Sequence, residues 1–331
     1  MQEFAKDRYE KMPYRRCGKS GLKLPAISLG FWQSLGEQDN EKICRECMYY
    51  ALDHGVTHFD LANNYGPPPG NSEFVVGKIL KDMPRDELII STKAGFYMWE
   101  GPYGDWGSKK YIVASLDQSL KRLGLDYVDI FYHHRPDPDT PLEETLGALD
   151  LIVKQGKALY TGLSNYRGER FRQAVDVVKQ HDWSPITIHQ PAYNMLDRWV
   201  EKDLLQYTAE AGTGVIAFVP LSQGVLTDRY LNGLPSDSRI GRCGDSGKQW
   251  YERLKADGVI DKVAKLNEIA KSRGQKMAQM AITWILRDDR ITSVLIGASR
   301  VEQLEDNLQA AQASPLTDEE LQEIEQILTG N

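Results

Sequence analysis

Short and nearly continuous apolar runs recur along the chain, most of them about 30 residues apart. That spacing accommodates one strand, one helix and two short loops. We therefore expect strands in the eight apolar runs and helices between them. The runs cover residues 25–31, 56–62, 88–95, 127–134, 158–164, 186–190, 214–220 and 292–299.

Segments of helical periodicity lie between these runs and carry start and stop signals. Residues 108–124 open on Ser108, repeat leucines along one face and end at Gly124. Residues 140–156 begin with Thr-Pro and end at Gly156. Because strands and helices alternate, the strands should be parallel with right-handed crossovers, and eight such units favour a closed (β/α)8 barrel.

An open, doubly wound sheet is the structural alternative, and it usually places a phosphate-binding glycine turn between a strand and a helix. The one match to such a turn, GTGVIA at residues 212–217, lies before an expected strand. It is better interpreted as a helix stop followed by a strand, which favours the barrel.

Two segments extend the basic pattern. Residues 12–25 contain a glycine-bracketed turn, which predicts a hairpin before the barrel. Residues 221–253 are rich in Gly, Ser and Arg and are expected to form an irregular cover over the strand-end face. Helices are expected around residues 262–271 and 277–288. We expect a single domain over residues 1–331.

Titratable side chains stand at the ends of three consecutive expected strands. Asp60 and Tyr65 follow the second run, Lys93 ends the third, and His134 ends the fourth. Because strand ends converge on one face of a barrel, these groups should meet there. Asp60 and Lys93 alone could form a structural ion pair and Tyr65 a surface aromatic, but together the four side chains favour catalysis.

Charge and composition exclude several partners. The net charge of -7 and the pI near 5.5 argue against nucleic acid or an anionic membrane. The start of the chain has no apolar signal region and no run is long enough to cross a bilayer, so we expect a cytoplasmic protein. Cys44 and Cys47 form a C-x-x-C inside a helical pattern, with no second pair at zinc spacing, so no metal site is expected.

The motifs HFDLANNYG, IISTKAG, YVDIFYHH, GLSNY, HQPAYN and IGASRVEQLEDN occur in this order along the chain. Together they resemble the aldo-keto reductase superfamily over essentially the whole length. CGKSGLKLPAISLG and MWEGPYG are similar to its branch of bacterial glyceraldehyde-3-phosphate and methylglyoxal reductases, near the potassium-channel beta subunits.

The resemblance implies a catalytic tetrad of Asp60, Tyr65, Lys93 and His134. Carbonyl reduction needs a hydride at carbon and a proton at oxygen, and Tyr65 would supply the proton. Lys93 would lower the pKa of Tyr65 from its reference value of about 10, while Asp60 would keep Lys93 charged. His134 would orient the carbonyl oxygen.

The resemblance also implies NADP(H) as the cofactor, bound at the strand ends and under the insert. Arg is suited to the 2′-phosphate of NADP because its planar fork binds phosphate through two nitrogens. The implied contacts are Ser164, Asn165 and Gln190 with Phe218 at the nicotinamide, Leu221, Gln223 and Gly224 at the pyrophosphate, Arg239, Ser299 and Arg300 at the 2′-phosphate, and Gln303 and Asn307 at the adenosine. Trp32, at the end of the first expected strand, matches a site tryptophan of the family and is counted with these contacts.

The expected function is NADPH-dependent reduction of small aldehydes or ketones, of the methylglyoxal or glyceraldehyde 3-phosphate type. Trp32 and Trp99 should wall the substrate pocket together with Tyr65 and His134. Two alternatives remain: an NADP-binding partner subunit of the channel-beta type, and a barrel enzyme that forms a Schiff base on Lys93. The resemblance also implies association into a homotetramer or a homo-octamer, as in related proteins.

Overall fold

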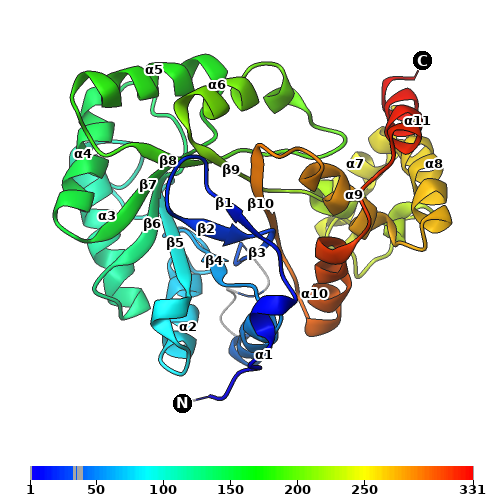
Figure 1. Cartoon of the computed structure of the whole chain (residues 1–331), viewed down its shortest axis with the longest axis horizontal. Coiled ribbons are helices and arrows are strands. Elements are labelled where there is room, and N and C mark those ends of the chain that lie inside the picture. Colours follow the sequence, from blue (N-terminus) through cyan, green and yellow to red (C-terminus); the bar gives the residue numbers. More distant parts are fainter. Residues whose placement is uncertain (1, 33–34, 36–39, 331) are drawn as a thin grey trace.

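A closed barrel of eight parallel strands forms the centre of the molecule in the computed structural model, which describes residues 2–32, 35 and 40–330. The strands neighbour one another in chain order and the last closes on the first (Figure 1). This confirms the predicted (β/α)8 fold. The strands are β3 (Ile27–Gly30), β4 (His58–Asp60), β5 (Ile89–Ala94), β6 (Val128–His133), β7 (Ala158–Ser164), β8 (Ile186–Gln190), β9 (Gly214–Ala217) and β10 (Ile291–Ile296).

The predicted hairpin is also present. Strands β1 (Tyr14–Arg16) and β2 (Lys23–Pro25) pair antiparallel. The turn between them lies against the amino-terminal ends of β8 and β9, because the Cys17 thiol donates to the carbonyl of Thr187 and the Lys19 amide donates to the carbonyl of Gly212. The hairpin thus covers the end of the barrel opposite the predicted site.

Helices surround the barrel as the sequence periodicity predicts (Figure 1). In α3, the Ser108 hydroxyl accepts from the amide of Tyr111 and Gly124 ends the helix with a left-handed φ of 66°, which satisfies both predicted signals. The helices are α1 (Glu41–Asp53), α2 (Asn71–Leu80), α3 (Lys109–Leu123), α4 (Leu142–Lys154), α5 (Gly168–Gln180), α6 (Leu204–Ala211), α9 (Met277–Leu286) and α10 (Val301–Leu308).

The GTGVIA segment has the predicted structure. Helix α6 ends at Ala211, Gly212 adopts a left-handed φ of 76°, and strand β9 begins at Gly214. No helix therefore opens on this glycine pair.

The insert between β9 and β10 is more regular than predicted. Its first part holds three short 3-10 turns, at Ser222–Gly224, Asp228–Tyr230 and Gly241–Cys243. The prediction that residues 221–253 are irregular throughout was wrong, because the last part of this segment belongs to helix α7 (Gly244–Ala256).

Burial explains why α7 forms despite its turn-like start. Tyr251 is buried, its ring packs on Tyr230 and its hydroxyl donates to the Tyr230 carbonyl over 3.0 Å. Tertiary packing of this kind outweighs weak local propensity. Helices α7, α8 (Val259–Ser272) and α11 (Asp318–Thr329) lie together on one side of the barrel (Figure 1).

The interior of the barrel is filled by side chains from alternate strand positions. Ile130, Tyr132, Ile188 and Ile216 form a buried apolar cluster. Gly162 on β7 leaves room for the Tyr132 ring, because a Cβ built there would lie 2.4 Å from Tyr132 Cδ1. Among the residues described, no helix is long and apolar enough to cross a membrane.

We predict that Gly162→Ala lowers the free energy of unfolding by about 1–3 kcal/mol, because the added methyl overpacks the barrel interior. Urea denaturation measures the change. Gly21→Ala is the matched control, since a Cβ at Gly21 meets no atom within 4 Å. Equal stability of the two variants would contradict the tight packing around Tyr132.

Candidate active site

The four predicted tetrad residues lie at the carboxyl ends of three neighbouring strands. Asp60 ends β4, Lys93 is the penultimate residue of β5, and His134 directly follows β6. Tyr65 lies in the loop between β4 and α2. Parallel pairing of β4 with β5 and of β5 with β6 brings these strand ends to one face of the barrel.

A buried ion pair is the centre of this group. Lys93 Nζ lies 2.5 Å from Asp60 Oδ2, and both side chains are fully buried. The same ammonium donates to the carbonyl of Leu61 over 2.6 Å and to the Tyr65 hydroxyl over 3.2 Å. All three protons of the ammonium therefore have an oxygen partner, and one partner is the phenol predicted to be the proton donor.

The pair keeps Lys93 protonated. Burial lowers the pKa of Lys93, but attraction to Asp60 and Tyr65 and the hydrogen bonds to both outweigh it, so the pKa is raised overall. Tyr65 behaves differently from the prediction. Burial raises its pKa, Lys93 opposes this and Asp60 adds to it, so that the pKa lies above its ordinary value. The expected lowering by Lys93 is present but is smaller than the effect of burial.

His134 faces the phenol across the site. Its ring lies 5.8 Å from the Tyr65 ring and 4.8 Å from the Phe96 ring, in edge-on contacts. Burial and the positive charge of Lys93 hold the pKa of His134 well below its usual range. A neutral imidazole at this position can donate a hydrogen bond to a carbonyl oxygen without being the acid itself.

Asp60 has two further donors that sequence reasoning did not assign to it. The Ser91 hydroxyl donates to Asp60 Oδ1 over 2.6 Å and Gln190 Nε2 donates to the same oxygen over 3.1 Å. His58 contacts the Ser91 hydroxyl over 2.9 Å. The available signal was the two-residue spacing of His58 from Asp60 and of Ser91 from Lys93, which places each pair on one face of a strand.

The residues predicted for the nicotinamide lie at the ends of β7 and β8. The Ser164 hydroxyl donates to the Gln190 carbonyl over 2.8 Å, and Asn165 Nδ2 donates to the His134 carbonyl over 2.9 Å. Asn165 has a left-handed φ of 62°, an uncommon conformation that is often found at functional sites. Asn165 is thus linked directly to the backbone of His134.

The loop after β9 carries further left-handed residues. Phe218 follows β9 and is half-buried, and Val219, Ser222 and Gln223 all have positive φ, as does Gly224. For the β-branched Val219 this is a strained conformation. The strain lies beside Leu221, in the segment predicted to cover the pyrophosphate.

Arg239 and Trp32 lie against each other. The Arg239 guanidinium lies over the Trp32 ring, 4.3 Å from its centre, and Trp32 is 47% exposed. Within the described residues, no carboxylate lies within ion-pairing distance of Arg239. A half-buried guanidinium without an acidic partner fits an anionic group such as a phosphate.

The other residues predicted for the 2′-phosphate and the adenosine lie just before α10 and along it. Ser299 donates through both its amide and its hydroxyl to Gln303 Oε1, over 3.0 and 2.9 Å. Arg300, at the cap position, pairs with Glu302 over 3.6 Å and both are exposed. Asn307 is buried on the same helix. Arg239 thus contacts Trp32, whereas Ser299 and Arg300 contact residues of α10.

In the aromatic loop after β5, the ring of Phe96 contacts the tetrad residue His134. Trp99, which was predicted to wall the substrate pocket, packs on Tyr111 with ring centres 5.2 Å apart. Arg135 lies over the rings of Phe96 and Trp106 and pairs with Asp105. Phe96 was missed because its contact depends on the conformation of an irregular loop.

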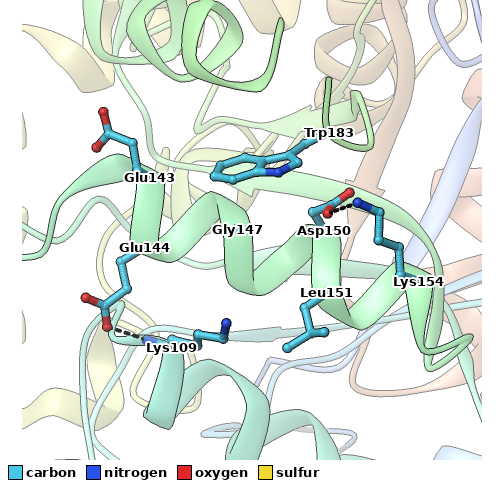
Figure 2. Close-up of a pocket in the computed structure, with 8 residues that line it drawn as sticks. All are labelled: Lys109, Glu143, Glu144, Gly147, Asp150, Leu151, Lys154 and Trp183. Carbon is cyan, nitrogen blue, oxygen red and sulfur yellow. Dashed lines mark hydrogen bonds and ion pairs between the residues drawn. The ribbon is translucent and has the colours of Figure 1, made fainter. Parts of the chain in front are cut away.

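A separate groove of about 620 Å³ lies on the outside of the barrel, along α4 (Figure 2). Trp183 faces α4 across it, and two of its charged residues already pair with each other, Lys154 with Asp150 over 2.7 Å. None of the predicted site residues lines this groove. It is therefore distinct from the candidate active site.

Comparison with known proteins identifies the family. Residues 26–329 match the model of the aldo/keto reductase family, so the chain belongs to that family and is one of its oxidoreductases. It is 53% identical over 325 residues to L-glyceraldehyde 3-phosphate reductase of Escherichia coli K12, an alignment that covers 97% of this chain and 93% of the relative.

The same identity and coverage hold for the L-glyceraldehyde 3-phosphate reductase of Escherichia coli O157:H7. A probable voltage-gated potassium channel subunit beta of Arabidopsis thaliana is 37% identical over 322 residues, with 96% of this chain and 97% of the relative aligned. Both groups are those that the sequence motifs resemble.

We predict that Lys93→Met lowers the free energy of unfolding by about 3–5 kcal/mol, because it leaves the Asp60 carboxylate buried and unpaired. The double variant Asp60→Asn/Lys93→Met should recover part of that loss, since it buries no charge. Denaturant unfolding of the single and double variants measures both. Additive losses in the double variant would contradict a direct pairing.

Proposed function

We propose that this chain is an NADPH-dependent reductase of small carbonyl compounds, and that Tyr65 is its proton donor. The observation that carries the proposal is the position of the Tyr65 hydroxyl, 3.2 Å from an ammonium that Asp60 keeps charged inside the barrel. The identity to L-glyceraldehyde 3-phosphate reductases supports the same activity.

The bound cofactor would supply a hydride to the carbonyl carbon. The chain supplies the proton and the orientation. A phenol with a raised pKa is protonated at neutral pH and can donate to the oxygen as negative charge develops there. The Lys93 ammonium then stabilises the resulting phenolate, and neutral His134 donates a hydrogen bond to the same oxygen.

Several features of the chain fit NADPH. Ser164, Asn165 and Gln190 offer amide and hydroxyl groups at the strand ends for a carboxamide, and Phe218 offers a ring face for stacking. Arg239, which pairs with no carboxylate among the described residues, offers its guanidinium for a phosphate. We assign the 2′-phosphate end to Arg239 together with Ser299 and Arg300.

Short aldehydes are the proposed substrates, with L-glyceraldehyde 3-phosphate and methylglyoxal as the first to test. The first follows from the name of relatives that share 53% of their aligned residues with this chain. Methylglyoxal has the same three-carbon skeleton, without the phosphate, and an aldehyde beside a second carbonyl. Trp32, exposed beside Arg239, would form one wall of the pocket.

The Schiff-base alternative is disfavoured by the state of Lys93. A nucleophilic amine must be neutral, whereas Asp60 and Tyr65 keep the pKa of Lys93 raised. Borohydride added with substrate should therefore leave no covalent adduct on Lys93 in mass spectra. An adduct there would replace the reductase proposal.

We predict that Tyr65→Phe reduces kcat for methylglyoxal by about 10²–10⁴-fold, the contribution expected of a general acid. NADPH binding, measured by quenching of tryptophan fluorescence, should be unchanged. Tyr97→Phe is the matched control because Tyr97 is 57% exposed on the loop after β5. Turnover that survives in Tyr65→Phe would overturn the assignment of the proton donor.

We also predict the pH dependence of the reduction. Because the pKa of Tyr65 is raised, the donor stays protonated below and through neutral pH and is lost only as pH rises through that pKa. kcat/KM for reduction should therefore be level from about pH 6 to 9, below the ordinary phenol value of about 10. A decline centred near neutral pH would show that another group controls the reaction.

A further inference from the structure

A line of hydrogen-bonded polar groups runs through the barrel interior and ends on Asp60. It starts at Ser293 on β10, whose hydroxyl lies 2.7 Å from that of Ser28 on β3. Ser28 Oγ lies 2.9 Å from His58 Nδ1. His58 Nε2 lies 2.9 Å from Ser91 Oγ, and Ser91 donates to Asp60. All five side chains have no exposed surface.

The direction of each hydrogen bond follows from the chemistry of the last acceptor. An ionised carboxylate only accepts, so the single proton of Ser91 points to Asp60. Ser91 Oγ must then accept from His58, which places the imidazole proton on Nε2. Burial lowers the pKa of His58 to about 4, so the ring is neutral and its Nδ1 accepts.

The remaining protons are fixed in the same way. Because His58 Nδ1 is an acceptor, the Ser28 hydroxyl donates to it, and Ser293 donates to Ser28 over the 2.7 Å contact. Every donor in the line therefore points toward Asp60. Hydrogen bonds aligned in one direction polarise one another, which strengthens the final bond to the carboxylate.

We propose that His58 is a positioning residue for the active site, which acts through Ser91 to orient and stabilise the Asp60 carboxylate that holds Lys93 against Tyr65. The proposal rests on the proposed function, because it assigns His58 a task in the same proton transfer. Among the described residues, the side chain of His58 hydrogen-bonds only to Ser28 and Ser91, and neither of these is predicted to bind substrate or cofactor.

Losing this donor line should raise the pKa of Tyr65. With fewer donors, the negative charge of the Asp60 carboxylate is less compensated and opposes the Tyr65 phenolate more strongly. Other titratable groups that face Asp60 or Lys93 from the described strands are Tyr132 and His134, and neither contacts His58 by a hydrogen bond.

The pH profile of alcohol oxidation at saturating NADP+ tests the proposal, with glycerol 3-phosphate as the probe in the full-length protein. This direction needs the Tyr65 phenolate, so kcat/KM rises with pH to a midpoint set by its pKa. We expect Ser91→Ala and His58→Leu to move that midpoint upward by about half a pH unit or more, a threefold effect below it.

A conservative variant and two other substitutions make the test specific. His58→Gln keeps an N–H near the position of Nε2 and should retain the wild-type midpoint. Ser28→Ala acts on the far side of the imidazole and should give a smaller shift in the same direction, even if Ser91→Ala fails to fold. Thr208→Val removes a buried hydroxyl on α6, outside the line, and should shift nothing.

The outcomes separate this inference from the proposed function. Two results would overturn the proposed function. The first is that the wild-type protein shows no NADP-dependent turnover, and the second is that Tyr65→Phe leaves the midpoint of the pH profile of kcat/KM unchanged. An active wild type whose midpoint is unmoved in Ser91→Ala, His58→Leu and Ser28→Ala would overturn only the role of His58. Slower turnover at every pH with an unmoved midpoint would likewise indicate a purely structural residue.

Discussion

The ion pair between Asp60 and Lys93 is the interaction on which the site depends. A carboxylate and an ammonium inside a barrel each cost several kcal/mol to remove from water, and only close pairing with further hydrogen bonds offsets that cost. Here Asp60 accepts from three side chains and the ammonium donates to three oxygens. The third of these oxygens is the Tyr65 hydroxyl, which couples the pair to the proposed chemistry.

The barrel makes this arrangement possible because it brings separate strand ends to one face. Three strands contribute polar residues at or near their carboxyl ends: Asp60 from β4, Lys93 from β5 and Gln190 from β8. The hairpin covers the opposite end of the barrel. The insert after β9 reaches back to the strand-end face, where Arg239 lies over Trp32.

The barrel could be predicted from the sequence because its strands are short apolar runs at regular spacing, and helix ends such as Ser108 and Gly124 carry their own signals. Helix α7 could not, because its glycine-containing start resembles a turn and its stability comes from Tyr251 packing on Tyr230. Local pattern contains no information on such distant contacts.

The tetrad was predicted from strand ends, whereas its supporting residues were not. His58 and Ser91 lie inside largely apolar runs, and the hydrogen bonds that link them to Asp60 depend on the register between β3, β4 and β5. The pKa of Tyr65 was predicted in the wrong direction because sequence reasoning considered the neighbouring charge and omitted burial.

The central claim is that hydride transfer to a carbonyl occurs at this strand-end site. Mass spectrometry of the product formed from methylglyoxal and NADPH deuterated at the transferable C4 position tests it most directly. The account predicts one deuterium on the former carbonyl carbon, and at least about a hundredfold less of this product when Tyr65→Phe replaces the wild type under the same conditions. Product without deuterium from the wild-type protein would contradict the account.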